Sequence, residues 1–317
     1  MIEHALLFTL GLVLLLLGAD NFLKGASGLA LRYGISPFIV GLVIVGLGTS
    51  APELAVNLSA VARDRYDLAL GNVVGSNIAN VGLILGISAM VAPLVVQMRL
   101  VRVEGPLMVL VSGALWLLCL DGLLGGFDSF LLMAGFVGLM WLLWRSAREE
   151  PSEVQAELGE LPCREVSLPK LILRLAIGLA ILLLGADLMV DSAVALARAW
   201  GWSELLIGLT VVAIGTSLPE LASSLVAAWR GQTDIAVGNV VGSNLFNILL
   251  ILGVTSTIKP LPVSAAMFDV ELPAMAGFAV LGYFLMQRFQ RLSRVSGAVL
   301  FVLFVGFTAW QAWAAIV

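Results

Sequence analysis

The stretches "GNVVGSNIAN" (71–80) and "GNVVGSNLFN" (238–247) are two copies of one decapeptide, and their spacing decides the fold. Each copy places amide and hydroxyl side chains inside sequence that is otherwise apolar. The offset that places Gly71 on Gly238, called here the repeat offset, also aligns "GLVIVGLGTSAPEL" (41–54) with "GLTVVAIGTSLPEL" (208–221) without a gap. The sequence therefore consists of two halves that are copies of each other.

The composition is that of an integral membrane protein. Of the 317 residues, 60% are hydrophobic and only 12% are charged, and the mean hydropathy is +1.05. A bilayer core about 30 Å thick needs roughly 20 apolar residues per helix, which predicts an all-α membrane protein with ten transmembrane helices. The predicted spans are 4–31, 36–61, 68–93, 105–120, 127–144, 171–197, 204–228, 235–258, 271–287 and 296–316.

The duplication predicts how the two halves are arranged. Residues 1–144 hold the first five spans, 145–170 form a polar linker, and 171–317 hold the second five. Because five is odd, the second copy enters the membrane from the opposite face, which gives two inverted five-helix repeats. We expect a site near the middle of the membrane, built from both copies.

The positive charges predict the orientation. With the N-terminus outside, 13 of the 17 Lys and Arg residues fall on the cytoplasmic side, and only Arg63, Arg65, Arg198 and Lys259 fall outside. Cytoplasmic loops carry an excess of Lys and Arg, so both termini are predicted to be external and the linker cytoplasmic. The expected partners are the lipid bilayer and small ions, with no nucleic acid and no obligate protein partner.

Glu53 and Glu220 are the residues that packing alone does not explain. Glycines four apart within the decapeptides are typical of close helix contacts. A carboxylate within a span instead costs at least about 2.5 to 3.5 kcal/mol, and it usually faces a cavity. Each Glu directly follows a proline, which lacks a backbone N–H and should break the helix there. Unwound backbone at this depth is tolerated where it lines a cavity.

Polar residues four apart in sequence extend the predicted site. Such residues share one helix face. The stripes in the first half are Thr49 with Glu53, and Asn72 with Ser76 and Asn80; those in the second are Thr216 with Glu220, and Asn239 with Ser243 and Asn247. Oxygen ligands without Cys or His suit hard cations such as calcium, and they would also serve sodium.

Competition between two cations at such a site would give a coupling mechanism. Two facing carboxylates left empty in a low dielectric make reorientation of the unloaded protein costly. Only a site filled by calcium or by several sodium ions would then cross the membrane, which is exchange.

The two motif pairs resemble the repeats of the sodium/calcium exchanger family, within the cation/calcium antiporter superfamily. The resemblance covers almost the whole chain and implies ten helices, with the second, third, seventh and eighth around the ion sites. It also implies that the long first and sixth helices slide across that core. The implied calcium ligands are Glu53 and Glu220, with oxygens from Thr49 and Thr216, sodium positions at Ser76 and Ser243, and backbone carbonyls at Gly46 and Ala213. Ser50, Ser217, Asn80 and Asn247 would line the same core.

The resemblance also implies an activity. It is secondary antiport of calcium against sodium across the cytoplasmic membrane, normally extruding calcium, by a transporter that is not an enzyme and has no prosthetic group. Potassium-dependent relatives have Asp where this chain has Asn247, so we expect no potassium requirement. The short linker has no room for a calcium-sensing domain, and the compact form resembles bacterial or archaeal members.

Alternatives remain open at the sequence level. A proton-coupled exchanger of calcium or another divalent cation would use the same two Glu residues as proton carriers. A membrane hydrolase would need a nucleophile and base, or a metal-bound water, and no span carries a suitable His. A passive channel would not need a site carried on both inverted halves. Asp20 and Asp187, which also match under the repeat offset, would fasten helices or assist a gate.

Overall fold

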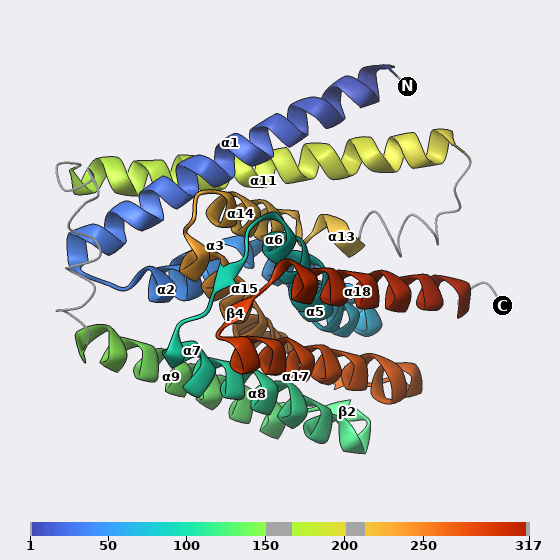
Figure 1. The fold of residues 1–317 in the computed structure, drawn as a ribbon. Coiled ribbons are helices and arrows are strands. Elements are labelled where there is room, and N and C mark those ends of the chain that lie inside the picture. The colour runs from blue at the N-terminus through green and yellow to red at the C-terminus, as the bar shows by residue number, and fades with distance from the viewer. Residues whose placement is uncertain (1, 150–166, 201–212, 315–317) are drawn as a thin grey trace.

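The computed structural model describes residues 2–149, 167–200 and 213–314, and nearly all of them are helical (Figure 1). The helices of the first half are α1 (Ile2–Tyr33), α2 (Pro37–Val40), η1 (Gly41–Val45), α3 (Gly46–Thr49), α4 (Ala51–Ala62), α5 (Tyr66–Ala79), η2 (Asn80–Leu85), α6 (Gly86–Val91), α7 (Met98–Arg102), α8 (Glu104–Leu118), η3 (Cys119–Asp121) and α9 (Gly126–Glu149). Those of the second are α11 (Leu168–Ala199), α13 (Ala213–Gly215), α14 (Leu218–Trp229), α15 (Thr233–Phe246), η6 (Asn247–Leu252), α16 (Gly253–Ile258), η7 (Met267–Glu271), α17 (Leu272–Phe289) and α18 (Arg294–Ala314).

Nine of the predicted spans are present as helical stretches in the described part of the chain. They are long and apolar enough to cross a membrane, and they begin and end within a few residues of the predicted bounds except where α7 lengthens the fourth span to Met98–Asp121. The predicted span 204–228 begins within residues 201–212, which lie outside the described residues. The all-helical membrane class is therefore confirmed.

The helices on either side of the predicted linker are longer than the hydropathy indicates. Helix α9 continues to Glu149 and α11 begins at Leu168, so both enter the stretch 145–170. Residues 150–166 lie outside the described part of the chain.

Helices α1 and α11 lie side by side as a layer across one side of the molecule (Figure 1). A Cβ atom added at Gly18 would lie 2.3 Å from the backbone nitrogen of Leu182, and one added at Gly185 would lie 2.4 Å from that of Leu15. Residue numbers rise along α1 as they fall along α11 at these contacts, so the two helices are antiparallel. Glycine at both positions lets the two backbones touch.

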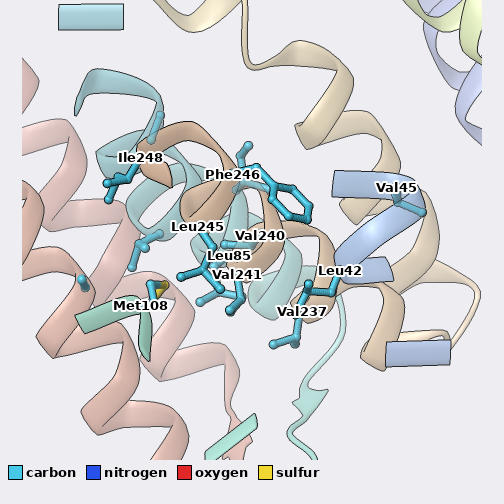
Figure 2. Close-up of a cluster of buried hydrophobic side chains, with 14 of the residues drawn as sticks. Leu42, Val45, Leu85, Met108, Val237, Val240, Val241, Leu245, Phe246 and Ile248 are labelled. Carbon is cyan, nitrogen blue, oxygen red and sulfur yellow. The ribbon is translucent and has the colours of Figure 1, made fainter. Parts of the chain in front are cut away.

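Helix α15 occupies the centre of the molecule. Helices α15, η6 and α16 form one stretch, and 94% of an 18-residue apolar segment within it is buried. The corresponding share for α9 is 22%. Figure 2 shows its apolar side chains packed with those of η1, η2 and α8; the labelled residues are Leu42, Val45, Leu85, Met108, Val237, Val240, Val241, Leu245, Phe246 and Ile248. This packing brings the second decapeptide against the first half.

The glycines of the second decapeptide make the close contact that their spacing predicts. A Cβ atom at Gly242 would lie 2.2 Å from the carbonyl oxygen of Leu42, and one at Gly238 would lie 2.6 Å from that of Phe38. At Gly71 and Gly75 no such neighbour lies within 4 Å among the described residues.

Two short strand pairs join the halves. Strand β1 (Leu94–Val95) pairs antiparallel with β4 (Arg291–Leu292), and β2 (Leu123–Leu124) pairs antiparallel with β3 (Leu261–Pro262). Strands β1 and β3 occupy equivalent positions under the repeat offset. In the described chain each pair therefore takes one strand from each half.

Candidate cation site

The helix breaks before the two Glu residues are confirmed. Helix α3 ends at Thr49, and α4 begins at Ala51 with Pro52 in its first turn. In the second half α13 ends at Gly215, and α14 begins at Leu218 with a proline in the same place. The break falls between Thr49 and Glu53, so these two residues belong to separate helical segments and not to one continuous stripe.

The broken segment of the first half contacts the Glu-bearing segment of the second. The hydroxyl of Ser50 donates a hydrogen bond to Oε1 of Glu220 at 3.2 Å, and the hydroxyl of Thr49 donates to Oδ1 of Asn239 at 3.2 Å. The sequence separations are 170 and 190 residues. Predicted site residues of the two copies therefore meet in one place.

Gly46 lies at the same contact. A Cβ atom added there would lie 3.3 Å from the backbone nitrogen of Ser243, on the central helix α15. The Thr49 hydroxyl, which has one hydrogen to donate, also has the carbonyl oxygens of Val45 and Gly46 within hydrogen-bond distance, at 3.0 and 3.4 Å. These two carbonyls thus lie close to the Thr49 hydroxyl, and the role of the Gly46 carbonyl as an ion ligand stays a prediction.

The two carboxyl groups are buried and near each other. Glu53 and Glu220 are each 1% exposed, and Ser50, three residues before Glu53, donates a hydrogen bond to Glu220. One oxygen of each, Oε2, accepts no hydrogen bond from the described residues. Two buried carboxylates need a compensating positive charge, and unpaired oxygens are the groups that would bind it.

Four neutral oxygens of the predicted site are also buried and, among the described residues, unpaired. They belong to two amides and two hydroxyls: Asn80 Oδ1, Asn247 Oδ1, Ser217 Oγ and Ser243 Oγ. Each half contributes to this set, and no group of three or more His, Cys, Asp or Glu gathers anywhere in the described residues. With the two carboxylates they form a donor set of oxygen atoms, which is the chemistry of a calcium or sodium site.

The first Asn of each decapeptide has a different role from the one that its spacing predicts. Nδ2 of Asn72 donates to the backbone carbonyl of Glu53 at 3.4 Å, and Nδ2 of Asn239 donates to that of Glu220 at 3.3 Å. Each also donates to a side-chain oxygen one turn further along the Glu-bearing helix. The Asn72 amide therefore holds the start of α4 against α5, and the Asn239 amide holds the start of α14 against α15.

The remaining predicted residues make fewer contacts. Ser76 is buried on α5, Thr216 is half-buried in the turn before α14, and Ala213 begins α13. Within the described residues neither Ser76 nor Thr216 forms a hydrogen bond with another predicted site residue. Their part in the site stays a prediction.

Asn77 and Asn244 are site neighbours that the helical spacing did not predict. Nδ2 of Asn80 donates to Oδ1 of Asn244 at 2.9 Å, and Nδ2 of Asn247 donates to Oδ1 of Asn77 at 3.1 Å. The two bonds are equivalent under the repeat offset. Their presence in both copies of the decapeptide was the available signal.

A π-helical turn starts at the last Asn of each decapeptide. Turn η2 begins at Asn80 and η6 begins at Asn247, which are again equivalent positions of the two halves. Such turns often occur at functional sites. They widen the helix where the two unpaired amide oxygens lie.

The symmetric acids outside the centre behave differently in the two halves. Asp20 on α1 forms ion pairs with Lys24, at 2.7 Å, and with Arg230, which directly follows α14. The equivalents of this second pair, Asp187 and Arg63, are exposed, and in the described chain they form no ion pair with each other. Asp20 therefore joins α1 to the end of α14 in this conformation, which fits either helix fastening or a gate.

Comparisons with known proteins identify the family of this chain. The chain matches the family described as "Sodium/calcium exchanger protein" over residues 3–145 and 170–313. It is 41% identical over 261 residues to the inner membrane protein YrbG of Escherichia coli (strain K12), covering 80% of this chain and 79% of that protein. It is 31% identical over 311 residues to the sodium/calcium exchanger MaX1 of Methanosarcina acetivorans, covering 87% and 89%.

A solved structure shares the fold. The sodium-calcium exchanger NCX_Mj, soaked with sodium and calcium, superposes with a TM-score of 0.83 at 30% sequence identity, covering 98% of each chain. The agreement extends over both halves and the core between them. This chain therefore belongs to the sodium/calcium exchanger family of membrane antiporters.

Proposed function

We propose that the protein exchanges calcium for sodium across the cytoplasmic membrane by alternating access, and that it normally extrudes calcium. The observation that carries the proposal is the buried pair Glu53 and Glu220, one from each half, each with a carboxylate oxygen left unpaired by the described residues. Two carboxylates neutralise one divalent ion, or they attract several monovalent ones. The names of MaX1 and NCX_Mj support this choice of ions.

The proposed ligands are oxygens from both copies. Glu53 and Glu220 bind calcium and also contact sodium, and Ser76 and Ser243 serve the outer sodium positions. The other ligands and lining residues are Thr49, Thr216, Ser50, Ser217, Asn80, Asn247, and the carbonyls of Gly46 and Ala213. Because these positions overlap, calcium and sodium compete, and the competition couples their movements.

The proposed architecture is two inverted repeats, 1–144 and 171–317, joined by the cytoplasmic linker 145–170. The antiparallel contact of α1 with α11 supports it, since equivalent helices that run in opposite directions imply an axis in the membrane plane. The start of α1 and the end of α18 lie at the same side in Figure 1, which fits two termini on one side of the membrane. The positive charges favour the external side.

Proton-coupled exchange is the second candidate. Two buried carboxylates near each other would exchange protons for a divalent ion with the same geometry. The neutral amide and hydroxyl oxygens would bind calcium in either mechanism, so the preference for sodium rests on the names of MaX1 and NCX_Mj.

The deciding experiment measures calcium uptake into proteoliposomes that contain the purified protein. We expect uptake under an imposed sodium gradient, and equal uptake when potassium is replaced by choline. Uptake driven by a proton gradient in sodium-free buffer would overturn the sodium assignment. Potassium dependence would contradict the expectation from Asn247.

A further inference from the structure

The side-chain amides of Asn80 and Asn247 form hydrogen bonds through their nitrogen edge and not through their oxygen edge among the described residues. On the nitrogen edge, each nitrogen donates to an Asn of the opposite half, at 2.9 Å for Asn80 to Asn244 and 3.1 Å for Asn247 to Asn77. On the other edge, each carbonyl oxygen is buried and has no partner among the described residues. The bonded edge therefore determines which atom of each amide stays open to an ion.

The orientation of an amide matters at a cation site. An Asn side chain has an acceptor oxygen on one edge and two N–H donors on the other, and the two edges have nearly the same shape. Turning the amide over would replace a cation ligand by two donors of partial positive charge. A ligand Asn thus needs a neighbour that accepts from its nitrogen.

Asn77 and Asn244 are suited to be that neighbour because their own nitrogens are engaged. Nδ2 of Asn77 donates to the backbone carbonyl oxygen of Asn244 at 3.4 Å and to the sulfur of Met275 at 3.6 Å. Nδ2 of Asn244 donates to the sulfur of Met108 at 3.4 Å. With their donors held, both present Oδ1 to the ligand amides.

These contacts repeat across the duplication. Met108 and Met275 are equivalent under the repeat offset, as are Asn77 and Asn244. All four are buried, with exposures of 1% and 2% for the methionines and 2% for both asparagines. The same short chain of bonds, from a methionine through an asparagine to a ligand amide, therefore occurs twice.

We propose that Asn77 and Asn244 are positioning residues that lock the carbonyl oxygens of Asn247 and Asn80 toward the transported cation. Each half thereby orients the ligand of the other half. This inference rests on the proposed function, because it needs a cation at the site. A purely structural role would instead have the two asparagines satisfy buried amides regardless of any ion.

A double-mutant cycle distinguishes these roles. Asn77→Leu keeps a side chain of similar shape and removes the acceptor, so Asn247 loses its fixed orientation. Asn247→Asp replaces the amide by a carboxylate, which has an oxygen on both edges and needs no orienting. The readouts are the Kd for calcium chloride with the purified protein, the KM and maximal rate of calcium uptake, and the melting temperature.

We expect Asn77→Leu to weaken calcium binding by about tenfold or more, the range typical of residues that orient metal ligands. In the Asn247→Asp background the same substitution should change the Kd by less than about threefold, because a carboxylate has an oxygen on both edges and needs no orienting neighbour. The matched control is Thr255→Val, which keeps the shape of a buried side chain and removes a hydroxyl that donates to the carbonyl oxygen of Ile251 in its own helical stretch. The control should leave the Kd unchanged.

Three outcomes decide the matter. An equal loss of affinity in both backgrounds would overturn the inference, since that is the behaviour of a structural residue. Calcium binding by the unmodified protein with an unchanged Kd in Asn77→Leu would also overturn it and would leave the proposed function standing. An unmodified protein that binds no calcium would overturn the proposed function, and the inference with it.

Discussion

At the scale of single residues, the two carboxylates carry the only formal charges among the described residues that we propose to face a transported ion. Glu53 and Glu220 occupy equivalent positions of the two halves and are buried to the same extent. The other oxygens proposed as ligands are neutral. The charge at the site is therefore set by these two side chains, and loss of either leaves a divalent ion without full compensation.

Glu53→Gln and Glu220→Gln should each abolish calcium exchange. We expect calcium affinity to fall by about 100-fold or more, because calcium sites depend strongly on the number of charged ligands. Uptake into proteoliposomes under a sodium gradient measures the effect. Glu3→Gln, which removes an exposed charge on α1, is the control and should exchange normally. Normal exchange by either site variant would show that the proposed site is wrong.

Some of these residues could be predicted from the sequence, and the contacts of others could not. Glu53 and Glu220 were predictable because an acid within an apolar span is conspicuous. The contacts of Asn77 and Asn244 were not, because each bonds to the other half, and periodicity along one helix carries no information on contacts between copies. The backbone bonds of Asn72 and Asn239 were missed because they join two neighbouring helices, which periodicity along one helix does not report either.

At the scale of elements, the breaks and the close contacts differ in how well they could be predicted. The breaks before α4 and α14 follow from proline, which cannot donate to the preceding turn. The π-turns η2 and η6 contain no residue that demands them. They depend on how the widened turn packs against neighbouring helices, which the local sequence does not encode.

The contact between α1 and α11 gives a prediction of its own. Gly18→Ala should lower the melting temperature in detergent by several degrees, since its Cβ would overlap the Leu182 backbone, which cannot yield as a flexible side chain could. Gly113→Ala on α8 has open space around its Cβ and should be neutral or slightly stabilising, given the higher helix propensity of alanine. Equal melting temperatures for the two variants would contradict the proposed backbone contact.

At the scale of the whole molecule, the contacts that only one half makes are the informative ones. Asp20 is paired with Arg230, whereas Asp187 and Arg63 form no ion pair with each other in the described chain. If the inverted repeats exchange conformations during transport, each contact that only one half makes in this conformation reappears in the alternate conformation at the equivalent positions of the other half. The alternate conformation should therefore pair Asp187 with Arg63.

Cysteine pairs can test this exchange in a background where Cys119 and Cys163 are replaced by Ser. A bifunctional thiol reagent long enough to replace the Arg side chain should cross-link Asp20→Cys with Arg230→Cys in the conformation described, and the cross-link should stop calcium uptake. Sodium and calcium concentrations are then varied. Arg63→Cys with Asp187→Cys should cross-link only under the ion conditions in which the pair at positions 20 and 230 does not. Failure of the second pair to react under every ion condition would contradict the exchange of conformations.

The strand pairs that join the halves have a consequence during synthesis, because the first half is made before its partners exist. Strands β1 and β2 find their partners β4 and β3 only in the second half, as do Asn77 and Asn80. At a synthesis rate of about 5 to 20 residues per second, the ribosome needs roughly 8 to 30 s to extend the chain from one copy to the equivalent point of the other. During that interval the newly inserted first half holds polar groups in the bilayer without their final partners, so shielding them is a task for the insertion machinery or for lipid.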